Sequence, residues 1–162
     1  MLSLQSRLVP GRAAILVLVC TFLAAGCGSD RLNREELLAR ADRICKTYDM
    51  QQNSLPFPST DPTASTTSFR ERAQWGAALN QIVLLGRQEG VALEKLRPPE
   101  ALEADYRRLL DAKDAAYDSL AATADAAKRN QPDRIKKLGA VGRKRLAEVT
   151  KLADAFGVSE CG

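Results

Sequence analysis

Residues 102–127 read LEADYRRLLDAKDAAYDSLAATADAA, and this unbroken stretch decides the fold. Its larger apolar side chains recur every three or four residues, at Leu102, Tyr106, Leu109, Leu110, Tyr117 and Leu120. That spacing places them on one face of an α-helix, and the many alanines between them favour helix. The stretch therefore predicts a long amphipathic helix with one buried face.

A second helix is expected C-terminal to this stretch. The segment Asn130-Gln131-Pro132-Asp133 interrupts the pattern, because proline is tolerated only in the first turn of a helix. Apolar residues then repeat at helical spacing as far as Phe156, and Gly157 is typical of a helix C-cap.

Two further helices are expected N-terminal to it. Ser68-Phe69-Arg70-Glu71 and Asn33-Arg34-Glu35-Glu36 both have the form of a capping box, which marks a helix start. Apolar periodicity follows each box, over about 33–53 and from 68 to the Pro98-Pro99 break. We expect Pro99 to begin the first turn of the helix that follows it.

The segment 54–67 between these two helices is rich in Pro, Ser and Thr, so it predicts a loop. A mobile connection and a glycosylated or partner-binding segment are both compatible with its composition. No alternating β-branched run occurs. The sequence thus predicts an all-α fold, an antiparallel four-helix bundle with this loop between its first two helices.

The N-terminal region has the pattern of an export signal. Residues 1–12 carry Arg7 and Arg12. The apolar residues 13–25 that follow are fewer than the roughly 20 that a membrane-spanning helix needs. An ordinary secretory signal and an uncleaved anchor are the alternatives to a lipoprotein signal. The segment Leu23-Ala24-Ala25-Gly26-Cys27 decides between them, because it resembles a bacterial lipobox, although Ala24 stands where Leu is commoner.

This resemblance implies that Cys27 receives a diacylglyceryl group and becomes the first residue after cleavage. Residues 1–26 would then be a signal peptide, 27–32 a lipid-anchored tether and 33–162 a single helical domain. Acyl chains attach a protein firmly to a bilayer, since each buried methylene contributes about 0.8 kcal/mol. The implied location is the extracytoplasmic face of the bacterial cell membrane.

Four cysteines are present, and two of them, Cys20 and Cys27, fall in the signal and the lipobox. Export would place the remaining pair, Cys45 and Cys161, in an oxidising compartment, so we predict a disulfide between them. A redox or metal-binding pair is the alternative. No C-x-x-C motif occurs, and two isolated thiols without histidine make a poor metal site. No metal site or cofactor is expected.

The composition argues against several functions. Histidine is absent, which removes the commonest general base and metal ligand. Without Arg7 and Arg12 the chain has 22 basic and 20 acidic side chains, too small an excess for nucleic-acid binding. A Ser–Lys pair is the one conceivable catalytic arrangement, and no motif supports it. We therefore expect no enzymatic activity.

Two charged surfaces are weaker candidates for binding sites. The carboxylates of Asp111, Asp114 and Asp118 share one helix stripe, which could hold Ca²⁺ or Mg²⁺ but is more often a solvated face neutralised by nearby cations. The last helix is basic and could touch anionic lipid or an envelope polymer. Its cations are spread around the helix, which favours an ordinary solvated surface.

Glycines inside the predicted helices, including Gly86 and Gly142, cost about 1 kcal/mol each relative to Ala and need a reason. Close helix packing is one reason. A cavity that admits an apolar ligand is another, and its candidate walls are the aromatic side chains Trp75, Tyr106, Tyr117 and Phe156.

The chain resembles the small uncharacterised helical lipoproteins of high-GC Gram-positive (actinobacterial) bacteria. The resemblance lies in the lipobox, Ala41-Asp42-Arg43-Ile44-Cys45, Leu96-Arg97-Pro98-Pro99-Glu100 and a cysteine near residue 162. It implies a membrane location and a bridged bundle, and no activity. Two functions are expected from these observations. The first is an envelope interaction or scaffold module that contacts another envelope protein or an anionic polymer. The second is a carrier of a small apolar ligand in a cavity between helices.

Overall fold

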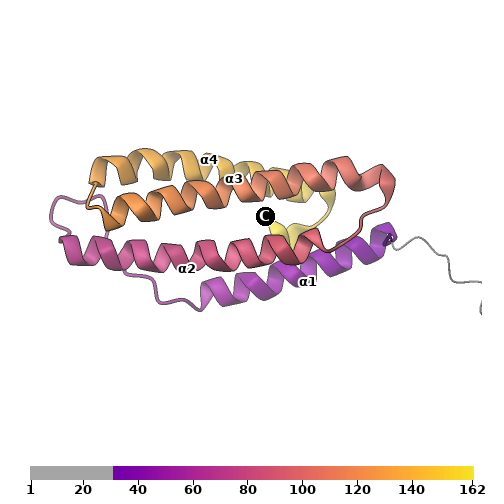
Figure 1. Ribbon diagram of the computed structural model, residues 1–162, viewed down its shortest axis with the longest axis horizontal. Coiled ribbons are helices and arrows are strands. Elements are labelled where there is room, and N and C mark those ends of the chain that lie inside the picture. Colours follow the sequence, from indigo (N-terminus) through magenta and orange to yellow (C-terminus); the bar gives the residue numbers. More distant parts are fainter. Residues whose placement is uncertain (1–30) are drawn as a thin grey trace, which may run out of the picture.

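The computed structural model describes residues 31–162, which form four α-helices arranged around a common core (Figure 1). These are α1 (Arg34–Asn53), α2 (Phe69–Glu94), α3 (Glu103–Lys128) and α4 (Pro132–Phe156). Two 3₁₀ turns, η1 (Glu100–Leu102) and η2 (Ser159–Cys161), complete the described part of the chain. This confirms the predicted all-α bundle with a loop after its first helix.

Local sequence signals set the helix ends. The Asn33 side chain accepts the backbone N–H of Glu36, and the Glu36 carboxylate accepts the N–H of Asn33 in return. Ser68 and Glu71 make the same reciprocal pair at the start of α2. Both predicted capping boxes are confirmed. Gly157 closes α4 with a φ of 97°, a backbone conformation that suits glycine.

The end of α2 and the start of α3 differ from the prediction. We expected α2 to reach Pro98 and Pro99 to begin the next helix. Instead α2 ends at Glu94, and Pro99 precedes η1, after which α3 begins at Glu103. A residue before proline is biased away from helical geometry, so the two successive prolines hold this connection extended.

The loop 54–67 is held in place by Arg72, whose side chain is only 6% exposed. Its guanidinium donates to the carbonyl oxygens of Pro62 and Ala64 and to the Asn130 side chain. The loop is therefore tied to α2 and to the α3–α4 turn, because a buried guanidinium needs these acceptors.

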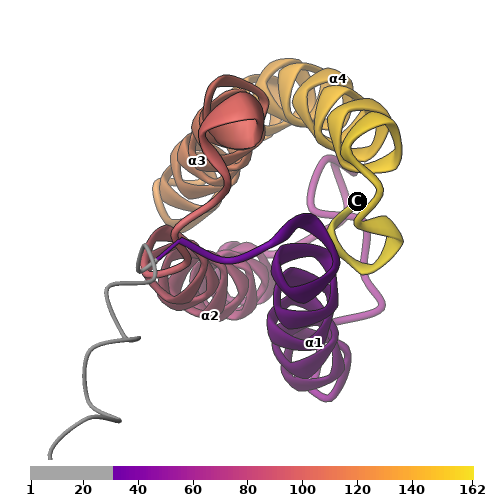
Figure 2. The ribbon, with the colours of Figure 1, turned by 90° about the vertical axis from the view of Figure 1, so that its right-hand side faces the viewer.

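The helices pack in chain order around a ring, and the C-terminal tail closes it. Viewed end-on, α1 lies beside α2, α2 beside α3 and α3 beside α4, with the segment after Phe156 between α4 and α1 (Figure 2). α1 and α4 share one core, but η2 fills the space between their backbones.

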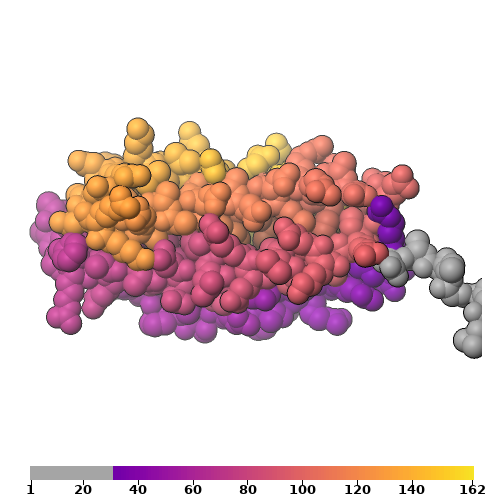
Figure 3. All heavy atoms as spheres, viewed as in Figure 1, coloured from indigo at the N-terminus to yellow at the C-terminus, as the bar shows by residue number. Residues whose placement is uncertain are grey.

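The described residues form an elongated body (Figure 3), and the core lies between its helices. Its largest buried side chains come from α1, α2, α3 and the tail: Leu37, Leu93, Leu109, Val158 and Cys45. Leu146 of α4 is 41% exposed and borders a cavity described below. No helix among residues 31–162 is both long and apolar enough to cross a membrane.

Candidate functional site

A cleft of about 670 Å³ lies between the end of α2, the α2–α3 connection and the first half of α3. Four apolar or aromatic residues contribute to its walls: Leu96, Pro98, Tyr106 and Leu110. Its other lining residues are all charged: Arg31, Glu94, Arg97, Glu103, Arg107, Asp111 and Asp114. The cleft therefore joins an apolar surface to charges of both signs.

The positive charges gather at the α2–α3 connection. Arg31 lies 2.9 Å from a Glu103 carboxylate oxygen and also donates to the carbonyl of Pro98. Arg107 lies 3.7 Å from the other oxygen of Glu103. One carboxylate thus faces two guanidinium groups, which leaves a local excess of positive charge.

The negative charges gather farther along α3. The Asp114 carboxylate lies over Gly90 of α2, because a Cβ built there would be 3.7 Å from its Oδ1. Glu94 is one turn after Gly90, and Asp111 is one turn before Asp114. Glu103 and Asp114 are separated by about 16 Å of helix at 1.5 Å per residue. The cleft thus has a basic end and an acidic end.

The segment assigned to the tether forms part of this cleft. Besides the contacts of Arg31, the backbone N–H of Leu32 donates to the carbonyl of Arg97 at 2.8 Å, and the Leu32 side chain packs against the core. Arg31 and Leu32 are therefore docked on the bundle. The predicted lipidation residue Cys27 lies outside the described residues, four positions before Arg31.

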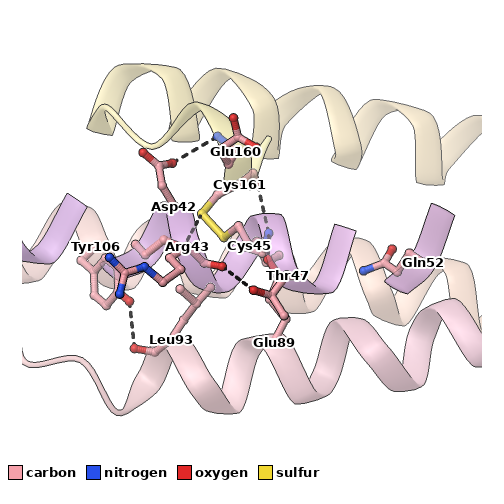
Figure 4. Close-up of a disulfide and its surroundings, with 12 residues drawn as sticks. Asp42, Arg43, Cys45, Thr47, Gln52, Glu89, Leu93, Tyr106, Glu160 and Cys161 are labelled. Carbon is pink, nitrogen blue, oxygen red and sulfur yellow. Dashed lines mark hydrogen bonds and ion pairs between the residues drawn. A yellow bond between two sulfur atoms is a disulfide. The ribbon is translucent and has the colours of Figure 1, made fainter. Parts of the chain in front are cut away.

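A second candidate region is a buried polar network at the centre of the bundle, which includes Glu89 beside the disulfide drawn in Figure 4. Lys113 of α3 and Glu89 of α2 form an ion pair of 3.0 Å, with side chains 7% and 4% exposed. Lys113 also donates to the carbonyl of Cys161 at 2.9 Å, and the hydroxyl of Tyr117 donates to Glu89 at 3.1 Å. Gln52 of α1 extends the network with a bond of 3.4 Å to Tyr117.

The network stands beside the predicted disulfide, which is confirmed: Cys45 of α1 is bonded to Cys161 of η2, with Cα atoms 5.0 Å apart. A cavity of about 310 Å³ opens on both, lined in part by Glu89, Lys113 and Tyr117. Burial, together with the negative charge of Glu89, raises the pKa of Tyr117 above its ordinary value. Its phenol therefore stays protonated and keeps donating to Glu89.

The four aromatic residues proposed to line one apolar cavity lie in three different places. Tyr106 and Phe156 pack together with ring centroids 5.5 Å apart, and the Tyr106 hydroxyl donates to the carbonyl of Leu93. Tyr117 borders the central cavity. Trp75 packs edge-on against Phe57 at the other end of α2, 5.3 Å between centroids. These four side chains do not form one shared pocket.

The charged residues that the sequence suggested as binding sites also lie in different places. Asp118 pairs with Arg87 of α2 at 3.1 Å, while Asp111 and Asp114 line the cleft. The neighbouring cations Arg107, Arg108 and Lys113 do not pair with these aspartates. They pair with Glu103, Asp105 and Glu89 instead. On α4 the Arg and Lys side chains are exposed and spread around the helix, without a single basic face.

Sequence reasoning missed the roles of Glu89 and Lys113, although a signal was present. Lys113 lies between Leu109 and Ala116 on the apolar face of its helix. Glu89 lies on the buried face of α2 that Gly86 and Leu93 define. A charged residue in the buried phase of a helix needs a partner, so two such residues on adjacent helices point to each other.

Comparison with known proteins identifies no relative: no family model, no curated protein and no solved structure matches the chain.

Proposed function

We propose that this chain is an extracytoplasmic lipoprotein, anchored through lipid on Cys27, whose helical domain binds a small dipolar molecule in the cleft between α2 and α3. The observation that carries the proposal is the composition of that cleft, an apolar surface with a basic end and an acidic end. Its volume of about 670 Å³ falls in the range of small-molecule sites.

The location is supported by two independent features. The leader with its lipobox is one, and the Cys45–Cys161 disulfide is the other, because such bonds persist in oxidising compartments outside the cytoplasm. Arg31 is four residues from Cys27, a span of at most about 14 Å when fully extended. Acylation of Cys27 would therefore hold the basic end of the cleft near the membrane surface.

The ligand class follows from the charges. A purely apolar ligand would displace water from the carboxylates and guanidinium groups without replacing their hydrogen bonds, which is costly. A dipolar molecule supplies an anionic group to Arg31 and Arg107 and a cationic group to Asp111 and Asp114. Charge-assisted hydrogen bonds of this kind are the strong ones, so they would set both affinity and orientation.

The test compares three soluble probes: glycerophosphoethanolamine, which carries both charges, glycerol 3-phosphate and ethanolamine. The dipolar probe should raise the melting temperature most, since binding to the folded state alone stabilises it. Arg107→Gln and Asp114→Asn should each reduce that rise. Arg87→Gln is the matched control, because Arg87 is exposed and lies outside the cleft. Equal rises with all three probes, or none with any, would contradict the proposal.

An envelope interaction module is the second candidate, favoured by the outer face of α2. Leu84 and Val91 are seven residues apart on this face and are 51% and 53% exposed. Exposed apolar residues that share a face can contact a partner. Crosslinking on intact cells tests this candidate: a crosslinked product that Leu84→Glu with Val91→Glu abolishes would support it, and a product that the double variant retains would contradict it.

A further inference from the structure

Three potential metal-ligand atoms converge at the centre of the bundle, away from the cleft. The Sγ atoms of Cys45 and Cys161 and a carboxylate oxygen of Glu89 all lie within 4.8 Å of one another, and all three residues are buried. They come from α1, η2 and α2, so only the folded chain assembles them (Figure 4). In the oxidised chain the two sulfurs are bonded to each other and bind no metal.

We propose that the dithiol form of this chain binds one zinc ion through Cys45, Cys161 and Glu89. A dithiol or phosphine reductant supplies two electrons that break the S–S bond, and two protons complete the two thiols. Zinc then forms two Zn–S bonds and one Zn–O bond, and the two thiol protons leave to solvent. Zinc is the natural match, because it accepts a mixed sulfur and oxygen set in tetrahedral geometry.

The charges of the core favour a divalent cation. Glu89 and Lys113 cancel each other, so the oxidised core is neutral. Two buried thiolates would add two negative charges, which are costly in a medium of low dielectric constant. A bound Zn²⁺ ion restores neutrality without removing the ion pair. The reduced, deprotonated pair thus carries the charge that a divalent cation neutralises.

The surroundings of Glu89 suit a metal ligand. The Lys113 ammonium contacts one of its oxygens and the Tyr117 hydroxyl donates to the other. Each carboxylate oxygen can accept a hydrogen bond and still bind a metal, and such outer contacts orient metal-binding carboxylates. The cavity of about 310 Å³ is lined by all three ligand residues. It provides a path for the ion and room for a water molecule as the fourth ligand.

The metal would replace the disulfide as the link between the tail and α1. With Cα atoms 5.0 Å apart, the two cysteine side chains can reach one ion by rotation about their Cα–Cβ bonds. The carbonyl of Cys161 would stay on Lys113. The proposal concerns the central site and is independent of ligand binding in the cleft.

The test uses the chain with Cys20→Ser and Cys27→Ser, so that residues 45 and 161 supply the only thiols. The protein is reduced with a phosphine under anaerobic conditions and titrated with Cd²⁺, whose thiolate complexes absorb in the ultraviolet. Zn²⁺ then competes for the site. We expect one ion per chain, displaced by Zn²⁺, and no absorbance from the oxidised protein.

Two variants examine the ligand set. Glu89→Gln should weaken Cd²⁺ binding by at least about tenfold, whereas the matched variant Glu148→Gln, at an exposed position of α4, should not. Cys45→Ser keeps the buried ion pair and should abolish the one-to-one complex, which covers the case in which Glu89→Gln fails to fold. The proposal is overturned if the reduced chain binds no Cd²⁺, binds it between two chains, or binds it equally well with Cys45→Ser or with a folded Glu89→Gln.

Discussion

The ring of Tyr117 on α3 lies directly against Gly86 on α2: a Cβ built at residue 86 would be 2.0 Å from Cζ of the ring. The missing side chain thus makes room for the phenol that donates to Glu89. This contact fixes how α2 and α3 align at the centre of the bundle, where the cavity and the disulfide meet.

Gly86→Ala should destabilise the chain by about 1–3 kcal/mol, because the ring must move to admit the methyl group. Gly90→Ala is the matched control on the same helix, since its Cβ would meet only Asp114 Oδ1 at 3.7 Å. It should stabilise by up to about 1 kcal/mol through helix propensity. Urea unfolding followed by circular dichroism measures both. Equal effects of the two substitutions would contradict the assigned contact.

Removal of the disulfide should cost about 4–5 kcal/mol in the chain-entropy model, because the bond joins residues 116 positions apart. The comparison is between the oxidised chain and the Cys45→Ser, Cys161→Ser double variant in metal-free buffer. A loss below about 1 kcal/mol would mean that the tail is held by its other contacts, among them the bond from Glu160 N–H to Asp42.

The buried ion pair predicts strong coupling between Glu89 and Lys113. Glu89→Gln or Lys113→Met alone should destabilise by about 3–5 kcal/mol, since each leaves a buried charge without its partner. The double variant should lose clearly less than the sum of the two single losses. A double-mutant cycle from urea unfolding gives the coupling, and additive losses would show that the two groups do not interact.

Alkaline pH should unfold the chain through two tyrosines. Burial raises the pKa of both Tyr106 and Tyr117 above the ordinary value near 10. A raised pKa in the folded state means that their stabilisation is fully present below pH 10 and is lost as pH rises further. Tyrosinate absorbance of these two residues should therefore appear together with the loss of helical circular dichroism. Ionisation of both phenols in a chain that stays fully helical would contradict their burial.

Much of the fold follows from local chemistry in the sequence. The Asn33 and Ser68 capping boxes and Gly157 mark helix ends through backbone hydrogen bonds that depend on a few neighbouring residues. The Cys45–Cys161 bond followed from counting thiols in an expected oxidising compartment. The end of α2 was less predictable. Near this end the helical geometry of the last turn competes with the extended geometry that Pro98 and Pro99 impose.

The candidate sites depend on contacts between helices, which local periodicity does not specify. Helical spacing placed Tyr106 and Tyr117 on one face of α3. It did not indicate which residues of the other helices they contact. The pairing of Glu89 with Lys113 depends on how far α2 slides along α3. The cleft depends on the docking of Arg31 onto the α2–α3 connection, where Pro98 is 67 residues away in the chain, and no sequence pattern indicated it.

Export and acylation of Cys27 are central to the proposed function, because they would hold the cleft at a membrane surface. Intact-mass and peptide mass spectrometry of the native protein from cell membranes tests this directly. We expect a product that begins at Cys27, carries a diacylglyceryl group on that sulfur and contains the Cys45–Cys161 disulfide. A product with an unmodified Cys27, and with Cys45 and Cys161 as free thiols, would contradict it.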